Sequence, residues 1–432
     1  MIRSNYQAQH SLPLRTKVLA AAGLLVFIRI LSGIPTPFTD PDYIMSVMKD
    51  NQALGFFNLL TGGGFSTMSL MALSISPYIT ASIIIQLLSV VFPRLEEMQR
   101  GDESERKKLE WLTIGLGIAL AFLQALGMAV GYGRSGLIKP YTWYSVLAVS
   151  LIWMLGAAIC IGTGKLITDR YVGNGVSLIL AVNIISSFPA DAYEVVSMIR
   201  TGVSIKALAV ILVLVAAALI YLVFCYVVFI NGCEKRIPVQ YASGASVRGG
   251  SIIHDIPIKI CQGSVVPVIF ASTLMAFPGM VASFFGQTPE WTRYLSQAYW
   301  FNPARMRYSI GCILFIILIF GFSYFYADIE MNPRILAEEI KKGGGIIPGF
   351  RPGKPTADYI ARQMRWTILF GAIALSLVAI LPIIVSGVFN LSRLSFLGTS
   401  AIIVCGVVLE TKKALQTQMG EKKRKSLTGR RK

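Results

Sequence analysis

The chain has 432 residues, of which 54% are hydrophobic and only 14% are charged, and its formal net charge at pH 7 is +18. Soluble globular proteins carry about 25% charged residues, so this composition excludes an ordinary soluble protein of two or three domains. A large positive charge can indicate a nucleic-acid partner, but the positions of the basic residues favour a membrane protein instead.

Long apolar runs recur along the whole chain. A helix needs about 20 apolar residues to cross a hydrocarbon layer about 30 Å thick, and by this measure we predict ten membrane spans. In chain order they cover residues 17–37, 72–92, 111–131, 143–165, 175–189, 205–230, 260–285, 307–328, 366–388 and 394–411. The first run is too long for a cleavable signal peptide and no small-residue cleavage site follows it, so we interpret it as the first span.

The stretch 54–70 is apolar, but Gly62, Gly63 and Gly64 interrupt it. Glycine is a poor helix former, so we predict that this stretch does not cross the membrane.

Lysine and arginine are unequally divided between the two sides of the predicted membrane. Ten spans place both termini on one side, and that side carries 30 of the 40 Lys and Arg residues, against nine on the other. Cytoplasmic segments of membrane proteins hold an excess of basic residues, so both termini are expected in the cytoplasm. The basic tail 412–432 is expected to contact anionic lipids.

Few residues suit metal, nucleotide or ion-coupled chemistry. The six cysteines form no C-x-x-C pair, and most lie in apolar runs as small apolar side chains. The glycine-rich string 131–136 follows a predicted membrane helix, whereas a dinucleotide site needs a strand, a turn and a helix. Charges within spans usually mark ion paths, and here they are few: Arg29, which can snorkel outward, and Asp328 and Glu330 near the cytoplasm. This scarcity argues against the main alternative, a ten-span solute transporter.

Two cytoplasmic loops, 231–259 and 329–365, are longer than a turn requires, and both mix basic residues with Gly and Pro. Long ordered loops are often functional. From this feature alone, a docking site and a solvated connector remain equal alternatives.

Seven segments match one known family in its order and at its spacings. They are 33–37, the blocks 58–63 and 77–88 taken together, 173–177, 236–242, 267–272, 332–353 and 398–400. By these segments, which together cover most of the chain, the sequence resembles the SecY family, the pore subunits of the protein-conducting channel.

The resemblance implies an all-α polytopic membrane protein of ten transmembrane helices, arranged as two pseudo-symmetric inverted halves of five around an hourglass pore. The N-terminal half is expected at 1–190, with a re-entrant plug helix at about 54–70. The C-terminal half is expected at 191–432, with the two docking loops and the basic tail.

A constriction ring of aliphatic side chains is implied for the pore. Its members are Ile79, Ile83, Leu180, Ile184, Ile269 and Ile403. The first two pairs are each four residues apart, so each pair shares one helix face. Such a ring closes around a chain of any sequence because it makes no specific hydrogen bonds, and it excludes water when empty, which opposes ion flow.

The resemblance also implies a plug and a gate that opens sideways to lipid between spans two/three and seven/eight. The plug residues are Asn58, Leu60, Gly62, Gly63, Gly64 and Phe65. The gate residues are Gln86, Ser89, Cys261 and Thr273. The small polar groups at the gate are equally suited to hydrogen bonds that pack helices together.

The two long loops correspond to the family's docking site for the SecA motor and the ribosome. The residues implied there are Lys235, Arg236, Arg248, Arg351 and Lys354. Arginine suits bidentate contacts with carboxylates and RNA phosphates. The sequence departs from the family at 243–248, where many members have a Lys/Arg-rich run, and at Cys261, a gate-helix position where the family usually has Asn.

The implied function is that of a passive channel without a cofactor, in which unfolded preproteins cross the bacterial cytoplasmic membrane and hydrophobic segments are released into lipid. The implied partners are SecE and SecG in the membrane, the SecA motor, which hydrolyses ATP, the ribosome, signal sequences, and YidC or SecDF. A SecY-like accessory channel for few substrates is the alternative that the altered 243–248 loop leaves open.

Overall fold

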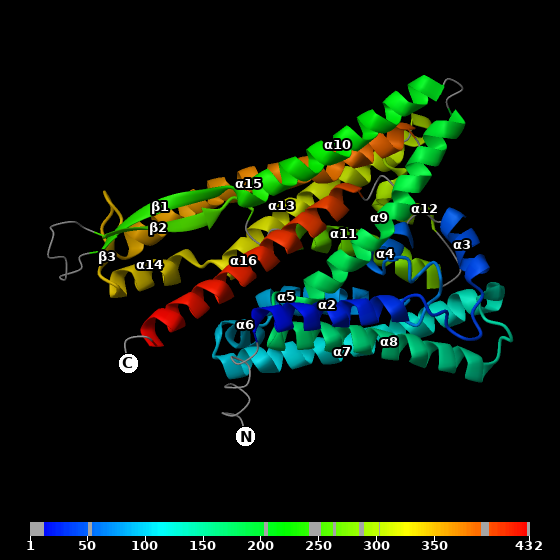
Figure 1. Ribbon diagram of the computed structural model, residues 1–432, viewed down its shortest axis with the longest axis horizontal. Helices are drawn as coiled ribbons and strands as arrows, with labels where there is room; N and C mark the ends of the chain where they lie inside the picture. The colour runs from blue at the N-terminus through cyan, green and yellow to red at the C-terminus, as the bar shows by residue number, and fades with distance from the viewer. Residues whose placement is uncertain are drawn as a thin grey trace.

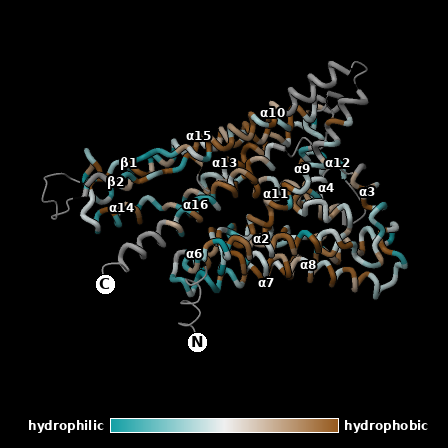
Figure 2. The backbone as a smooth tube through the Cα atoms, in the orientation of Figure 1, coloured by the Kyte–Doolittle hydropathy of each residue, from teal (hydrophilic) through white to brown (hydrophobic). Residues whose placement is uncertain are grey.

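The computed structural model describes residues 13–50, 54–202, 206–241, 252–261, 265–284, 289–301, 303–389 and 397–429. Figure 1 shows two groups of helices lying one above the other, with the early helices below and most of the late helices above. In Figure 2, hydrophobic residues follow the long helices, whereas hydrophilic residues gather at the end that holds the strands and at α6.

The helices of the first part of the chain are α2 (Leu14–Leu31), α3 (Pro41–Asp50), α4 (Leu54–Leu60), α5 (Ser76–Val91), α6 (Pro93–Arg100), α7 (Glu103–Tyr132), η1 (Gly133–Leu137), α8 (Trp143–Arg170) and α9 (Gly175–Gly202). The elements that follow are α10 (Lys206–Gly232), β1 (Glu234–Tyr241), β2 (Ile252–Lys259), α11 (Val266–Phe284), α12 (Glu290–Leu295), η2 (Gln297–Tyr299), η3 (Pro303–Ser309), α13 (Ile310–Glu330), α14 (Pro333–Lys342), β3 (Gly345–Ile346), α15 (Lys354–Phe389) and α16 (Leu397–Gly429).

Each of the ten predicted spans falls on a helix, but several boundaries differ. The first span was expected to reach residue 37, whereas α2 ends at Leu31. Pro35 and Pro37 follow, and proline disfavours helix both at its own position and at the preceding residue. The chain here forms turns instead, and Pro35 between them forms an antiparallel bridge with Ser69.

The fifth span was expected to be short, yet α9 continues through Pro189 to Gly202. Likewise, α15 begins at Lys354, well before the expected span at 366–388. A helix does not have to end at the membrane surface, and hydropathy reports only its apolar part.

Several helices are suited to a membrane by length and composition. Within the described residues, four are long and apolar enough to cross a bilayer: Glu103–Leu137, Trp143–Arg170, Met306–Lys342 and Lys354–Gly387. A fifth is formed if α5 and α6 are taken as one span, although the chain bends by 115° between them, at Pro93. Three shorter apolar helices are Gly175–Ala190, Ile220–Gly232 and Val266–Ala282. The chain is thus a multi-pass membrane protein, as the sequence predicts.

The two long loops meet in a three-stranded antiparallel sheet of order β2-β1-β3. β1 pairs with β2 from Glu234↔Lys259 to Tyr241↔Ile252, and with β3 at Gln240↔Ile346. Beneath the sheet lies a separate small core that includes Ile237, Val239, Ile340 and Ile360. The sheet is therefore a packed structure on the ends of α14 and α15, not a pair of solvated connectors.

Candidate functional site

The six aliphatic residues expected to form the ring come from four helices. Ile79 and Ile83 lie on α5, Leu180 and Ile184 on α9, Ile269 on α11 and Ile403 on α16. Each is at most 9% exposed, and all six belong to one continuous hydrophobic cluster. These apolar side chains exclude water from the region that they fill, so the cluster is chemically suited to a seal.

The same cluster includes Phe56, Leu59 and Leu60 of the short helix α4. α4 packs against α9 and α11, and the turns after it are held by side chains. Asn58 Oδ1 accepts a hydrogen bond of 2.9 Å from the backbone N–H of Ser66, and Thr61 Oγ1 accepts one of 3.0 Å from that of Phe65. Residues 54–70 thus form a compact, largely buried unit whose helix has 7 residues, too few to cross a membrane, as expected for this stretch.

Two of the three consecutive glycines have left-handed backbones, with φ of 63° at Gly62 and 87° at Gly63. L-residues rarely adopt this conformation. At Gly62 space is also lacking, because an added Cβ would lie 2.6 Å from Arg29 Nη1 and 2.8 Å from the backbone oxygen of Asn183. Gly62 is therefore a point of close approach between the α4 unit and two other helices.

Two polar side chains hold this unit from outside it. Arg29 on α2 donates from Nη1 to the Gly62 carbonyl oxygen at 3.1 Å, so it points into the protein instead of snorkelling to the surface. Asn183 on α9 is 1% exposed and donates from Nδ2 to Leu60 O at 2.9 Å and to Ser74 Oγ at 3.1 Å. Sequence reasoning missed Asn183; its only signal was a lone amide among apolar residues in the fifth span.

Three of the four expected gate residues lie on two helices that contact each other: Gln86 and Ser89 are on α5, and Thr273 is on α11. Gln86 donates from Nε2 to Ser82 Oγ at 3.0 Å, and Ser89 donates from Oγ to the Gln86 carbonyl oxygen at 2.7 Å. Thr273 on α11 is 1% exposed, and its Oγ1 has no hydrogen-bond partner within the described residues. Because α11 packs against α5 and α7, this contact is closed.

Cys261 is not on the gate helix, which corrects the expectation for it. β2 runs to Lys259, Ile260 N donates to Cys233 O at 3.1 Å, and α11 begins only at Val266. The strand pairing at the base of the hairpin thus keeps this part of the chain out of the helix. Cys261 is buried beside that base at 3% exposure.

The expected docking residues are brought to one end of the molecule. Lys235 and Arg236 are exposed on β1, and Lys235 Nζ donates to Gln363 Oε1 of α15. Arg351 is exposed in the turn between Gly349 and Gly353, which have φ of 87° and 106°. Lys354 is the first residue of α15, and Arg248 lies outside the described residues. Since β3 pairs with β1, the two loops form one surface.

The turn that carries Arg351 is fixed on both sides. Phe350 stacks on Tyr359 with ring centroids 4.2 Å apart, and Thr356 Oγ1 donates to the Arg351 carbonyl oxygen at 2.8 Å. The backbone of the turn is therefore anchored to α15, while the guanidinium is left exposed.

The sheet is also tied to the C-terminal helix α16. Lys413 Nζ lies 2.8 Å from Glu234 Oε1. The hydrogen bond from Lys413 lowers the pKa of the Glu234 carboxyl, and partial burial opposes that shift. Within the described residues, no group of three or more His, Cys, Asp and Glu side chains is placed to hold a metal ion.

Comparison with known proteins identifies relatives over nearly the whole chain. The SecY family model matches residues 69–412. The protein translocase subunit SecY of Mycobacterium tuberculosis is 34% identical, over 97% of this chain and 98% of that protein. The SecY of Halalkalibacterium halodurans is 36% identical, over 94% of this chain and 95% of that protein.

Solved structures show the same fold. The structure of a protein-conducting channel matches with a TM-score of 0.66 at 19% identity, covering 92% of this chain and 91% of that one. Sec61 in a canine ribosome–channel complex matches with a TM-score of 0.65 at 19% identity and the same coverage of both chains.

Proposed function

Because the chain belongs to the SecY family of protein translocase subunits, we propose that its buried aliphatic cluster is the closed pore through which unfolded secretory proteins cross the membrane. One observation carries the proposal: aliphatic residues from α5, α9, α11 and α16 converge in one cluster with a short helix that is too short to span a membrane. Ordinary lipid-facing packing has no need for such a helix.

The aliphatic ring acts as a hydrophobic seal. Branched apolar side chains hold no water in the empty pore, and a dry constriction opposes ion flow. When a polypeptide enters, the same side chains press against it without selecting a sequence, because they offer it no hydrogen bonds. The two halves of the chain separate about the connection between α9 and α10 to admit it. This connection follows Gly202, so the division between the halves lies beyond the expected residue 190, which is within α9.

The α4 unit, residues 54–70, acts as the plug. Irregular backbone at membrane depth is tolerated where it is buried in protein or lines a cavity, and here it is buried. Arg29 and Asn183 hold the plug in the closed state by its carbonyl groups. A moving plug exchanges these few hydrogen bonds for others, so its release has a small barrier compared with unfolding a helix.

Hydrophobic segments are released sideways where α11 contacts α5 and α7. Parting these helices exposes the ring to lipid and lets an apolar segment leave the pore. Gln86, Ser89 and Thr273 lie along this path, and their polar groups lower the free-energy cost of water entering between the parted helices.

The sheet and the Arg351 turn form the cytoplasmic docking surface for the SecA motor and the ribosome. Their exposed basic side chains complement acidic protein groups and RNA phosphates. ATP is hydrolysed by the motor, while SecE and SecG accompany the chain in the membrane. The excess of basic residues on the side of both termini favours a cytoplasmic location for them in a bacterial cell.

The test is ion leak through the resting channel. Replacing Ile83, Ile184 and Ile403 with Gly removes ring volume, and we expect ion flux through reconstituted liposomes to rise about tenfold or more, equivalent to about 1.4 kcal/mol of lost barrier. The matched control replaces Leu155, Ile313 and Leu377, which are 55%, 59% and 52% exposed, with Gly. Equal leak in both triple variants would show that weakened helices, not a lost seal, cause the flux.

A further inference from the structure

Two arginines lie together at the end of the molecule opposite the sheet, where α12 and η3 precede α13 (Figure 1). Arg293 is on α12, and Arg307 is on η3, which leads directly into α13. Arg307 Nη2 donates to the Tyr308 hydroxyl at 3.0 Å, and a hydrogen bond with the same hydroxyl raises the pKa of Arg293. One phenol oxygen therefore gathers two guanidinium groups from different elements.

The positive charge of this pair is only partly neutralised. Glu290 Oε1 lies 4.0 Å from Arg293 Nη1, and Glu290 Oε2 lies 3.7 Å from Arg307 Nη2. Both distances are longer than a hydrogen bond, and the side chains of Glu290 and Arg307 are 73% and 62% exposed. Two positive charges thus share one loosely held carboxylate, which an anion of better geometry can displace.

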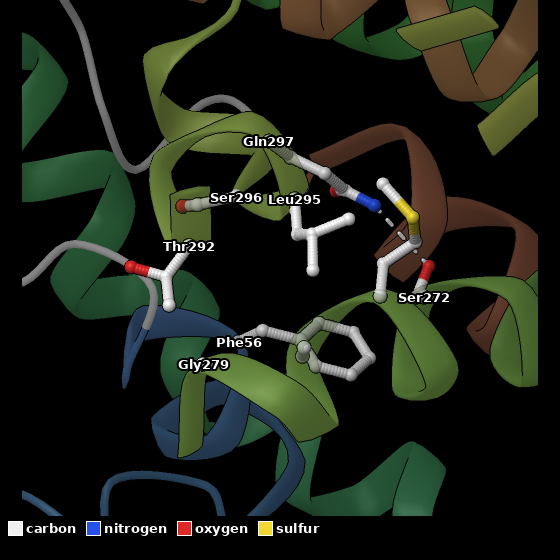
Figure 3. A pocket seen from close by; sticks show the side chains of 9 residues that line it. Phe56, Ser272, Gly279, Thr292, Leu295, Ser296 and Gln297 are labelled. Atoms are coloured by element: carbon white, nitrogen blue, oxygen red, sulfur yellow. Dashed lines mark hydrogen bonds between the residues drawn. The ribbon is translucent and has the colours of Figure 1, made fainter. Parts of the chain in front are cut away.

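The segment that carries Arg293 is fixed to the body of the protein. Figure 3 shows Leu295 of α12 projecting toward Phe56 of α4, and Gln297 reaching toward Ser272 of α11. Gln297 donates from Nε2 to Ser272 Oγ at 3.4 Å, and α12 also packs against α11, α13 and η3. Because the backbone under the arginines is held in place, a ligand there has little main chain to order.

An exposed apolar stripe on α13 begins three residues after Arg307. Its members are Ile310, Ile313, Leu314 and Ile317, which are 64%, 59%, 43% and 60% exposed. Their spacing places them on one helix face, over about 10 Å of its length. Side chains three residues apart eclipse in a 3₁₀ helix such as η3, so Arg307 heads this stripe. Since Met306–Lys342 is long and apolar enough to span a membrane, the stripe is suited to contact with acyl chains.

The arginine pair and the stripe together define the ligand chemistry. Guanidinium groups match phosphate oxygens in geometry and charge, and the excess of positive charge favours a headgroup without a cation of its own. A free inorganic anion would leave the stripe uncovered. We propose that Arg293 and Arg307 bind the phosphate of an anionic phospholipid, whose acyl chain lies along residues 310–317 of α13. This site does not depend on the aliphatic cluster being a pore.

The probes are phosphatidylglycerol and phosphatidylcholine that carry the same photoreactive diazirine acyl chain. Each is added in trace amount to nanodiscs that hold the full chain, and mass spectrometry locates the crosslinks. Because any lipid contacts an exposed helix, the measurement is the ratio of crosslinking by the two lipids at residues 310–317. We expect phosphatidylglycerol to exceed phosphatidylcholine about fivefold, the factor that one net positive charge gives near anionic lipid.

Three variants test the role of the charges. Arg293→Gln/Arg307→Gln should lower the ratio to about one. Arg134→Gln is the matched control, because Arg134 is an exposed arginine on η1, and it should keep the ratio of the parent. Glu290→Gln should raise the ratio by about a further fivefold, because it removes the carboxylate that competes with the phosphate.

Equal crosslinking by the two lipids in the parent, or an unchanged ratio in the double arginine variant, would overturn the site. A lower ratio in Glu290→Gln would overturn the competition between carboxylate and phosphate on which the proposal rests. Glycerophosphoglycerol, the headgroup without acyl chains, should leave the ratio unchanged when added in excess. If it abolished the preference, the arginines would bind a soluble phosphate and the lipid site would be wrong.

Discussion

The guanidinium of Arg29 donates from Nη1 to the carbonyl oxygen of Gly62 at 3.1 Å, across 33 residues of sequence. Gly62 thereby becomes the point at which the α4 unit, our proposed plug, is held to α2. The contact needs a bare backbone at that residue, because a Cβ would lie 2.6 Å from the same nitrogen atom.

Gly62 and Gly63 form a matched pair for testing this contact. Both have positive φ, so an Ala substitution at either costs about 1–2 kcal/mol of left-handed strain. Only Gly62→Ala also meets Arg29 and Asn183, since nothing lies within 4 Å of a Cβ at Gly63. We expect Gly62→Ala to raise the ion leak of the resting channel well above the leak of Gly63→Ala. Equal leak in the two variants would contradict an anchoring role for Arg29.

The plug itself is tested by crosslinking. Phe65 and Tyr132 of α7 line the same small cavity and are 4% and 6% exposed. In the variant Phe65→Cys/Tyr132→Cys, we expect a short thiol crosslinker to join the plug to α7 in the resting channel and to stop export. A substrate jammed in the pore should lower the crosslinked fraction, and the single variant Phe65→Cys serves as the control for native cysteines. A yield that a jammed substrate does not change would contradict a mobile plug.

The sequence predicts the helices well because each rests on a local property, the length of an apolar run. It fails at boundaries such as Gly202 of α9 and Lys354 of α15, where the helix continues past the apolar stretch. It also fails for Cys261, because the pairing at the base of β1 and β2 fixes that residue and hydropathy carries no information about it.

The contacts that hold the candidate site are the part least accessible from sequence. Asn183 meets Leu60 across 123 residues, and the pairing of Gln240 with Ile346 joins two loops that look independent along the chain. Both are non-local, and neither leaves a periodic pattern in the residues around it. Even the ring residues, which are buried as a seal requires, are indistinguishable by residue type from the other aliphatic residues of the chain.

The bond between Glu234 and Lys413 predicts a pH dependence. The pKa of Glu234 is lowered in the folded chain from its ordinary value of 4.5, so its stabilising effect is complete above that value. The effect is lost as the pH falls through the lowered pKa. We expect hydrogen-exchange protection of β1 to weaken at acidic pH below about 4.5.

Glu234→Gln supplies the control for that dependence. Without the carboxylate, the hydrogen-exchange protection of β1 should be lower at neutral pH. It should also no longer change over the acidic pH range in which Glu234 becomes protonated in the parent chain. Parallel pH curves for the parent and Glu234→Gln would show that another group controls the attachment of the sheet to α16.

Arg351 offers the sharpest test of docking, because Lys342 is a matched control in the same loop. Both side chains are exposed, so neither substitution should affect folding by more than about 0.5 kcal/mol. Arg351, however, is held on a turn anchored by Phe350 and Thr356, whereas Lys342 is the last residue of α14. A planar donor on a fixed turn is suited to one acidic partner, and losing such a contact costs about 2–5 kcal/mol at an interface.

We therefore expect Arg351→Glu to slow motor-driven export by about 30-fold or more, at an unchanged level in the membrane, and Lys342→Glu to slow it only slightly. Export rate divided by membrane level is the measurement. Equal loss in both variants would indicate general loop charge, and normal export by Arg351→Glu would exclude this turn from docking.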